Sequence, residues 1–237
     1  MTTTTSKITT TIPTLRIRRT TGETAFAFTI GPRTRTWSLL PLPNRILSHF
    51  LDHLGKSLGV QFELTAADWP GSWAFDHVLC EDLGQLVGRG FAELARRRAR
   101  ATGIAGRGEA TVCLDDAMLT VVCSLEGRPR VDWSLPNGAS IDGFVDSWYD
   151  GDRVAGAAYG TNLRQFVDGF ALGAGATVRL VVTQCGNLHH CYEALFRGLG
   201  DAMRLAIGLD AGRLPGDSSG FAGDADYAVQ DDEVGRD

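Results

Sequence analysis

Two stretches of the sequence decide how this chain is organised: DHVLCED at residues 76–82 and NLHHCYEA at residues 187–194. Each contains a histidine four residues before a glutamate. On an α-helix this spacing places the two side chains on one face, one turn apart. Because the likeness continues beyond both stretches, the sequence predicts two related halves, residues 15–105 and 106–214, that share one core.

The repeat keeps a constant offset along the chain. The pair His189 and Glu193 lies 112 residues after the corresponding pair of the first stretch, the difference between positions 189 and 77. The same offset relates Leu51 to Leu163, His53 to Gln165, Leu83 to Leu195 and Gly88 to Gly200. We therefore expect two copies of one structural unit that pack against each other rather than fold as separate beads.

Hydrophobic patterns predict strands and helices in both halves. Alternating, β-branched runs indicate strands, and apolar residues every three or four positions indicate helices. We expect strands over residues 24–30, 62–66, 118–123 and 177–183, helices over residues 46–58, 82–100, 163–172 and 193–207, and a turn over residues 133–138. The predicted fold class is α/β (α+β), with two duplicated α/β half-domains.

Composition and charge exclude several classes of protein. The chain has 237 residues, of which 43% are apolar and 22% charged, as is ordinary for a soluble globular protein. Its apolar stretches fall short of the roughly 18 residues that a membrane span needs. Seven acidic residues and one arginine in residues 215–237 account for −6 of the net charge of −5. The body is therefore near neutral, and we expect neither a nucleic-acid nor a membrane partner.

The ends and the cysteines indicate a cytoplasmic protein. Residues 1–14 are rich in threonine and lack an apolar core, so we expect a disordered tail rather than a secretory signal. Residues 215–237 are expected to form a second, acidic tail. Five cysteines, an odd number without a CxxC motif, favour free thiols in a reducing compartment.

The two His–Glu pairs are candidate metal clamps. An imidazole nitrogen with a carboxylate oxygen suits manganese, iron or zinc. A single pair at this spacing is more often a surface pair, but two pairs in register, in a chain with five histidines, favour metal binding. The neighbours His189 and His190 cannot face the same way on a helix, so we expect them to serve different sites of a two-metal centre.

Further landmarks accompany the clamps in a fixed order. They are Glu23-Thr24, LDHL at 51–54, DHVLCED at 76–82, LDDA at 114–117, EGRP at 126–129, residues 187–197 and DSSG at 217–220. Over about residues 15–220, these landmarks resemble those of the imidazoleglycerol-phosphate dehydratase family. The resemblance implies duplicated α/β halves whose helices pack between two mixed β-sheets.

The resemblance also implies an activity and an assembly. Members of this family are hydro-lyases of histidine biosynthesis. The resemblance therefore implies an enzyme that removes water from a phosphorylated imidazole-glycerol substrate. The resemblance further implies a large homo-oligomer with di-manganese sites between its subunits. For this chain the resemblance implies a small phosphorylated substrate and manganese, as one or two divalent ions per subunit.

The same resemblance assigns roles to individual residues. The implied metal ligands are His53, His77, Glu81, His189, His190 and Glu193. The implied catalytic residues are Glu23, Glu81 and Glu193. The implied substrate-binding residues are Arg107, Arg128, Arg197, Ser218 and Ser219. Arginine suits the last role because its planar fork matches a phosphate.

Several positions depart from the family's pattern. Val78 and Gln165 stand where the family has histidines, and valine cannot ligate a metal. Arg197 replaces a lysine and keeps its charge, whereas the lysine expected after Ser219 is missing. The ligand set that the resemblance implies is therefore reduced.

The reduced ligand set leaves alternatives open. If His53 joins the first clamp together with His190, one complete site survives; if His53 joins the second clamp, each site keeps three ligands. His49 lies four residues before His53 on the same helical face. It is either a substitute ligand or, as we favour, a solvated or core histidine. The function is that of a working dehydratase, of a divergent paralogue acting on another substrate, or of an inactive binding homologue, which the retained clamps disfavour.

Overall fold

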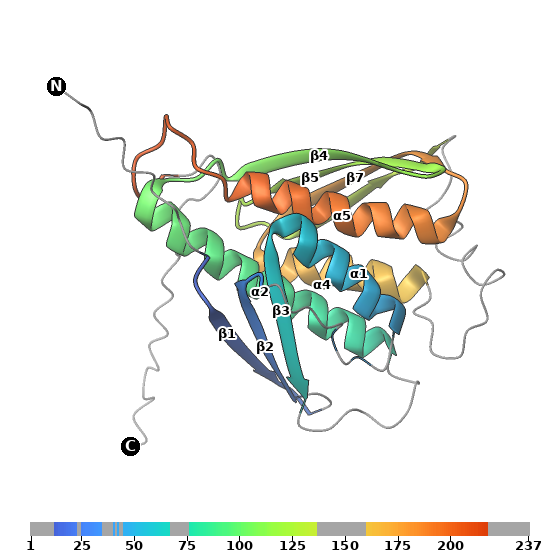
Figure 1. The fold of residues 1–237 in the computed structure, drawn as a ribbon, viewed down its shortest axis with the longest axis horizontal. Coiled ribbons are helices and arrows are strands. Elements are labelled where there is room, and N and C mark those ends of the chain that lie inside the picture. Colours follow the sequence, from blue (N-terminus) through green and yellow to red (C-terminus); the bar gives the residue numbers. More distant parts are fainter. Residues whose placement is uncertain are drawn as a thin grey trace, which may run out of the picture.

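The chain forms two similar successions of elements around a shared layer of helices (Figure 1). The computed structural model describes residues 12–22, 25–34, 40, 42, 45–66, 76–136 and 160–217. Each succession has two strands, a helix, a further strand and a long helix, and the second has an additional strand before its first helix. No helix in this described part is long and apolar enough to cross a membrane.

The first sheet is antiparallel. It contains, in this order, β1 (Leu15–Thr20), β2 (Ala25–Pro32) and β3 (Val60–Ala66). Burial alternates along β2, where Phe26, Phe28 and Ile30 are buried and the residues between them are more exposed. This alternation gives the sheet one apolar face, which lies toward the helices (Figure 1).

The second sheet is mixed. Its strands are β4 (Arg107–Leu114), β5 (Ala117–Ser124), β6 (Arg130–Ser134) and β7 (Thr177–Cys185), in the order β4-β5-β7-β6. β6 runs parallel to β7, and the other pairs are antiparallel. β5 buries Ala117, Leu119, Val121 and Cys123 on its helix-facing side. The helices are thus covered by an apolar sheet face on either side (Figure 1).

The helices pair across the two halves. They are α1 (Arg45–Leu58), α2 (Asp76–Thr102), α4 (Gly160–Ala174) and α5 (Leu188–Ala206). α1 packs against α5, and α2 packs against α4. The first helix of each half therefore contacts the long helix of the other half, and the buried apolar side chains form one continuous core.

Glycines allow α2 and α4 to approach closely. A Cβ atom added to Gly84 or Gly88 would lie 2.2 Å from a backbone oxygen of α4. A Cβ atom added to Gly169 or Gly173 would lie 2.4 or 2.1 Å from a backbone oxygen of α2. The two backbones are in direct contact here, which only residues without a side chain permit.

The structure confirms the predicted fold class, with two differences in detail. Each predicted helix and strand is present, but α2 and α5 begin earlier than expected, so both His–Glu pairs lie within the first two turns of a helix. β1, β4 and β6 were not predicted, and Trp133 and Ser134 lie in β6 rather than in a turn. Residues 137 and 138 of that predicted turn lie outside the described residues, as do the tail at residues 1–11 and the residues after 217.

Candidate metal and active site

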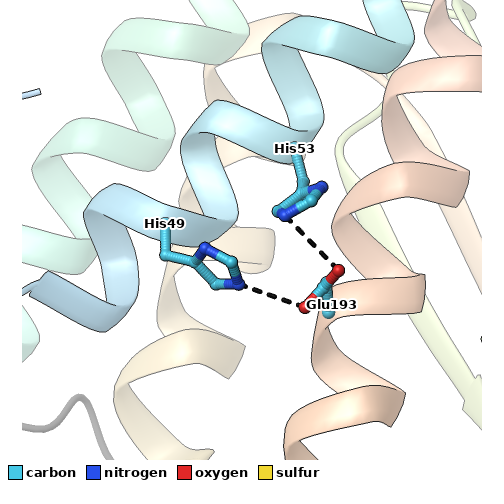
Figure 2. Close-up of side chains that lie close together, drawn as sticks. All are labelled: His49, His53 and Glu193. Atoms are coloured by element: carbon cyan, nitrogen blue, oxygen red, sulfur yellow. Dashed lines mark hydrogen bonds and ion pairs between the residues drawn. The ribbon is translucent and has the colours of Figure 1, made fainter. Parts of the chain in front are cut away.

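Glu193, on the second turn of α5, is the centre of a cluster of basic side chains. It is 8% exposed. His49 Nε2 lies 3.1 Å from Glu193 Oε2, and His53 Nε2 lies 3.3 Å from Glu193 Oε1. Figure 2 shows that both imidazole rings come from α1 and point toward this carboxylate on α5. The cluster therefore joins the two halves of the chain.

Two further side chains reach the carboxylate from α5 itself. His189 Nε2, one turn before Glu193, lies 3.5 Å from its Oε2. Arg197, one turn after, donates from Nη2 to Glu193 Oε1 at 2.5 Å and from Nε to His53 Nδ1 at 3.1 Å. The predicted clamp of His189 and Glu193 is thus present on one face of the helix, as the spacing requires.

Local structure fixes both helices that carry the cluster. Asn187 caps α5, and its side chain accepts a hydrogen bond from the backbone N–H of His189 at 2.8 Å. α1 approaches α5 closely, since a Cβ atom on Gly200 would lie 2.5 Å from the backbone oxygen of Leu54. The rings of Phe50 and Phe196 stack between the helices, with centroids 5.3 Å apart. These contacts hold His49 and His53 against Glu193.

The electrostatics favour a negative Glu193 and a neutral His53. Burial alone would raise the pKa of Glu193, but the hydrogen bond from His49 and the charge of Arg197 oppose it, and that pKa is lowered. Burial lowers the pKa of His53, because a charged imidazolium is poorly solvated there, although the Glu193 carboxylate opposes this effect. Both groups therefore keep lone pairs at neutral pH.

The cluster has a donor set that fits a divalent ion. One ligand atom each from His49, His53 and Glu193 lies within 4.8 Å of the others. Two imidazoles and one carboxylate suit manganese, iron and zinc. Glu193 is buried and negative, so a cation would offset the cost of its burial.

His190 faces a different set of residues from its neighbour His189. Its Nδ1 lies 2.8 Å from Asp116 Oδ1, and its Nε2 lies 3.6 Å from Asp115 Oδ2, both in the turn between β4 and β5. The hydrogen bond with Asp116 raises the pKa of His190. The two adjacent histidines thus point to separate environments, as the helical geometry predicted.

The first clamp lies on the other pair of helices, α2 and α4. Glu81 is exposed on α2 and accepts a hydrogen bond from Gln85 at 3.1 Å. Gln165, the counterpart of His53 in the repeat, lies on α4; its buried Oε1 has no hydrogen-bond partner among the described residues. The side chain of His77 lies outside the described part. This helix pair is therefore the counterpart of the His53–Glu193 pair, with glutamine in place of histidine.

The predicted substrate-binding arginines lie in different places within one chain. Arg197 belongs to the cluster, whereas Arg107 pairs with Glu109 at 2.9 Å on an exposed strand. Arg128 is exposed in the segment between β5 and β6, and its backbone oxygen accepts a hydrogen bond from Thr177. Both lie at the end of the second sheet that is remote from the β4–β5 turn beside His190. The structure of one chain does not bring all these arginines together.

The remaining predicted residues lie outside the described part: Glu23, Ser218 and Ser219. Conversely, the structure adds His49, which we had favoured as a solvated or core histidine. Its helical spacing from His53 was the only signal in the sequence, and that spacing does not show which way the shared face points.

Comparison with known proteins agrees with the geometry. The family model described as "Imidazoleglycerol-phosphate dehydratase" matches residues 43–203. Curated relatives of that name include one from Halorhodospira halophila, which is 29% identical over 85% of this chain and 95% of its own length. Another, from Pseudomonas savastanoi pv. phaseolicola, is 30% identical over 71% of this chain and 78% of its own length.

Solved structures show the same fold. A crystal structure of the Pyrococcus furiosus enzyme superposes with a TM-score of 0.62, at 28% identity, over 82% of this chain and 95% of that one. The Staphylococcus aureus enzyme superposes with a TM-score of 0.63 at 19% identity, over 84% of this chain and all of that one. With its fold and a family match over most of its length, the chain belongs to the imidazoleglycerol-phosphate dehydratase family and is a hydro-lyase of that type.

Proposed function

We propose that this hydro-lyase is a divalent-metal enzyme that removes water from imidazole glycerol phosphate, with manganese as its ion. The observation that carries the proposal is the cluster around the buried carboxylate of Glu193, where His53 Nε2 lies 3.3 Å from one oxygen and His189 Nε2 lies 3.5 Å from the other. Arg197, beside the same carboxylate, supplies a cation for the phosphate of the substrate. Retention of these groups favours catalysis over an inactive binding role.

Each group has a distinct proposed task. A bound divalent ion would act as a Lewis acid and as a template that orients the substrate. Glu193 with the histidines holds that ion and keeps its charge in place. Glu81, exposed on α2, and Glu23 are proposed to move protons between substrate and departing water. Arg197 anchors the phosphate, together with the residues named next.

The division of the arginines supports a homo-oligomeric enzyme. Arg107 and Arg128 lie far along the second sheet from the Glu193 cluster, so one chain cannot use all of them on one substrate. We propose a large homo-oligomer in which Arg107, Arg128, Ser218 and Ser219 of one subunit complete the site of another. No disulfide forms among the described residues, which include all five cysteines. This is consistent with the reducing cytoplasm as the proposed location.

The experiment is a metal analysis combined with a turnover assay on imidazole glycerol phosphate. We expect one or two divalent ions per subunit, loss of turnover on chelation, and recovery when manganese is returned. An Arg197→Lys variant should keep activity, since lysine retains the charge, whereas Arg197→Ala should raise KM. A protein that binds metal but leaves this substrate unchanged would be a paralogue with another substrate. Absence of both metal and turnover would contradict the proposal.

A further inference from the structure

We propose that His49, His53 and Glu193 form a divalent-cation site within a single chain, with His49 as a ligand from outside both His–Glu clamps. The inference rests on the metal dependence proposed above, but it concerns a residue to which the family resemblance gives no role. It also assigns Arg197 a second task, as the internal competitor of the cation.

His49 places a ligand atom at the Glu193 carboxylate, and its ring packs against the other histidines of the cluster. Its Nε2 lies 3.1 Å from Glu193 Oε2, and its ring meets the ring of His53 edge-on, with centroids 4.6 Å apart and planes at 80°. The ring of His189 stacks on it at 5.5 Å. The His49 side chain is 38% exposed, so an ion can reach it from solvent. Figure 2 shows the two imidazoles of α1 converging on the carboxylate.

His49 adds an imidazole to the Glu193 cluster, whereas the two positions that have lost the family's histidines lie on the other helix pair, α2 and α4. Val78 cannot ligate a metal, and Gln165 carries an amide, which is a poor substitute for imidazole. Position 49 lies one helical turn before His53, so α1 alone supplies two imidazoles to one carboxylate of α5. Three protein ligands leave positions open for water or substrate, as catalytic metal sites require.

Arg197 opposes this cation in the metal-free chain. A guanidinium has no acceptor, so Nδ1 of His53 must accept the hydrogen bond from Arg197 Nε. A neutral imidazole that accepts at Nδ1 carries its proton at Nε2, the atom that faces Glu193. If Nε2 binds a cation, this proton must shift to Nδ1, which then can no longer accept the hydrogen bond from Arg197 Nε, so Arg197 must leave. The departing guanidinium then becomes available to a phosphate.

The test measures binding of manganese alone to the full-length, assembled protein, by calorimetry and by the electron paramagnetic resonance signal of free Mn²⁺. His49→Gln keeps size and polarity but loses the imidazole ligand; we expect it to bind one ion fewer per subunit, or to bind about tenfold more weakly or worse. His49→Glu restores a ligand at similar reach and should bind within about threefold of the wild type. Arg45→Gln, one turn earlier on α1, is the matched control and should leave binding unchanged.

A second measurement concerns the competitor. Arg197→Gln removes the positive charge and offers His53 Nδ1 an acceptor, so it should tighten manganese binding by about tenfold. Tighter binding in Arg197→Gln together with weaker binding in His49→Gln is a pattern that a merely structural role would not produce.

Several results would overturn the inference. They are wild-type affinity in His49→Gln, equal losses in the glutamine and glutamate variants, or no manganese binding by the wild type. The turnover assay separates this inference from the proposed function. If wild-type protein turns over the substrate but His49→Gln binds manganese normally, only the His49 site is wrong. If manganese binding depends on His49 but the substrate is not converted, only the proposed reaction is wrong.

Discussion

Glu193 shows how much one residue depends on its neighbours. Its carboxylate is buried, yet a hydrogen bond from His49 and the charge of Arg197 help to keep its pKa low. The same spacing on α2 leaves Glu81 exposed, with Gln85 as its hydrogen-bond partner. The same His–Glu spacing thus leads to two different environments for the glutamate, because different residues pack opposite each helix.

The residues that replace the family's histidines lead to a first prediction. Val78→His combined with Gln165→His should raise the number of manganese ions bound per subunit. The buried Oε1 of Gln165 has no hydrogen-bond partner among the described residues, so this position is already polar and poorly satisfied. Elemental analysis of the purified protein measures the change. Val78→Gln alone is the control, and an unchanged metal count in a folded, assembled double variant would mean that these positions do not face a metal.

A second prediction at this scale concerns Glu93 on α2. Its carboxylate lies 2.7 Å from Arg97 Nε and 2.7 Å from Arg96 Nη1, and the hydrogen bond from Arg97 lowers the pKa of Glu93 most. Because the pKa is lower in the folded than in the unfolded state, the ionised form stabilises the fold above the unfolded pKa. That stabilisation is lost as the pH falls through the folded pKa.

Glu93→Gln should therefore lower the free energy of unfolding by about 0.5 kcal/mol at neutral pH, and the difference should vanish in acid. Urea unfolding curves at several pH values provide the measurement. Glu109→Gln, which breaks a pair between two exposed side chains, is the control and should have a smaller effect. An effect of Glu93→Gln that is independent of pH would point to lost packing instead.

Among the elements, the contact of α2 with α4 leaves little space for side chains. Gly88 faces Phe170, and a Cβ atom there would lie 2.2 Å from its backbone oxygen and 2.7 Å from the backbone nitrogen of Ala174. Neither atom can yield without moving the helix. The packing of α2 from the first half on α4 from the second half thus depends on glycines at the point where the backbones touch.

Gly88→Ala should lower the free energy of unfolding by about 1–3 kcal/mol or more, as overpacking does. Differential scanning calorimetry should show a lower Tm. Gly22→Ala is the matched control, because a Cβ atom there meets no atom within 4 Å. Equal Tm values for Gly88→Ala and the wild type would mean that α2 and α4 lie further apart than the structure places them.

At the scale of the whole molecule, the distribution of charged residues makes an assembly the natural expectation. The Glu193 cluster lies between α1 and α5, while Arg107 and Arg128 lie at the remote end of the second sheet. Light scattering should therefore give a mass several times the 25.5 kDa of one chain. A single species of monomer mass that still turns over substrate would refute the shared site.

The sequence by itself determined the duplication, the spacing of the two His–Glu pairs, the family and the positions where the family's histidines are missing. These follow from residue identity and spacing along a helix, which are local properties, and the helices and central strands were predictable for the same reason. The strands β1, β4 and β6, each at the edge of a sheet, were not, because their strand structure depends on pairing with β2, β5 and β7.

Only the tertiary structure decided that His49 joins the site and that Arg197 holds both His53 and Glu193. His49 and Glu193 are 144 residues apart along the chain, and they meet because α1 packs on the long helix of the other half. That pairing is set by backbone approach at Gly200 and by ring packing between Phe50 and Phe196, which helical periodicity does not encode. Spacing along one helix names the residues that share a face, and the packing of helices decides what that face meets.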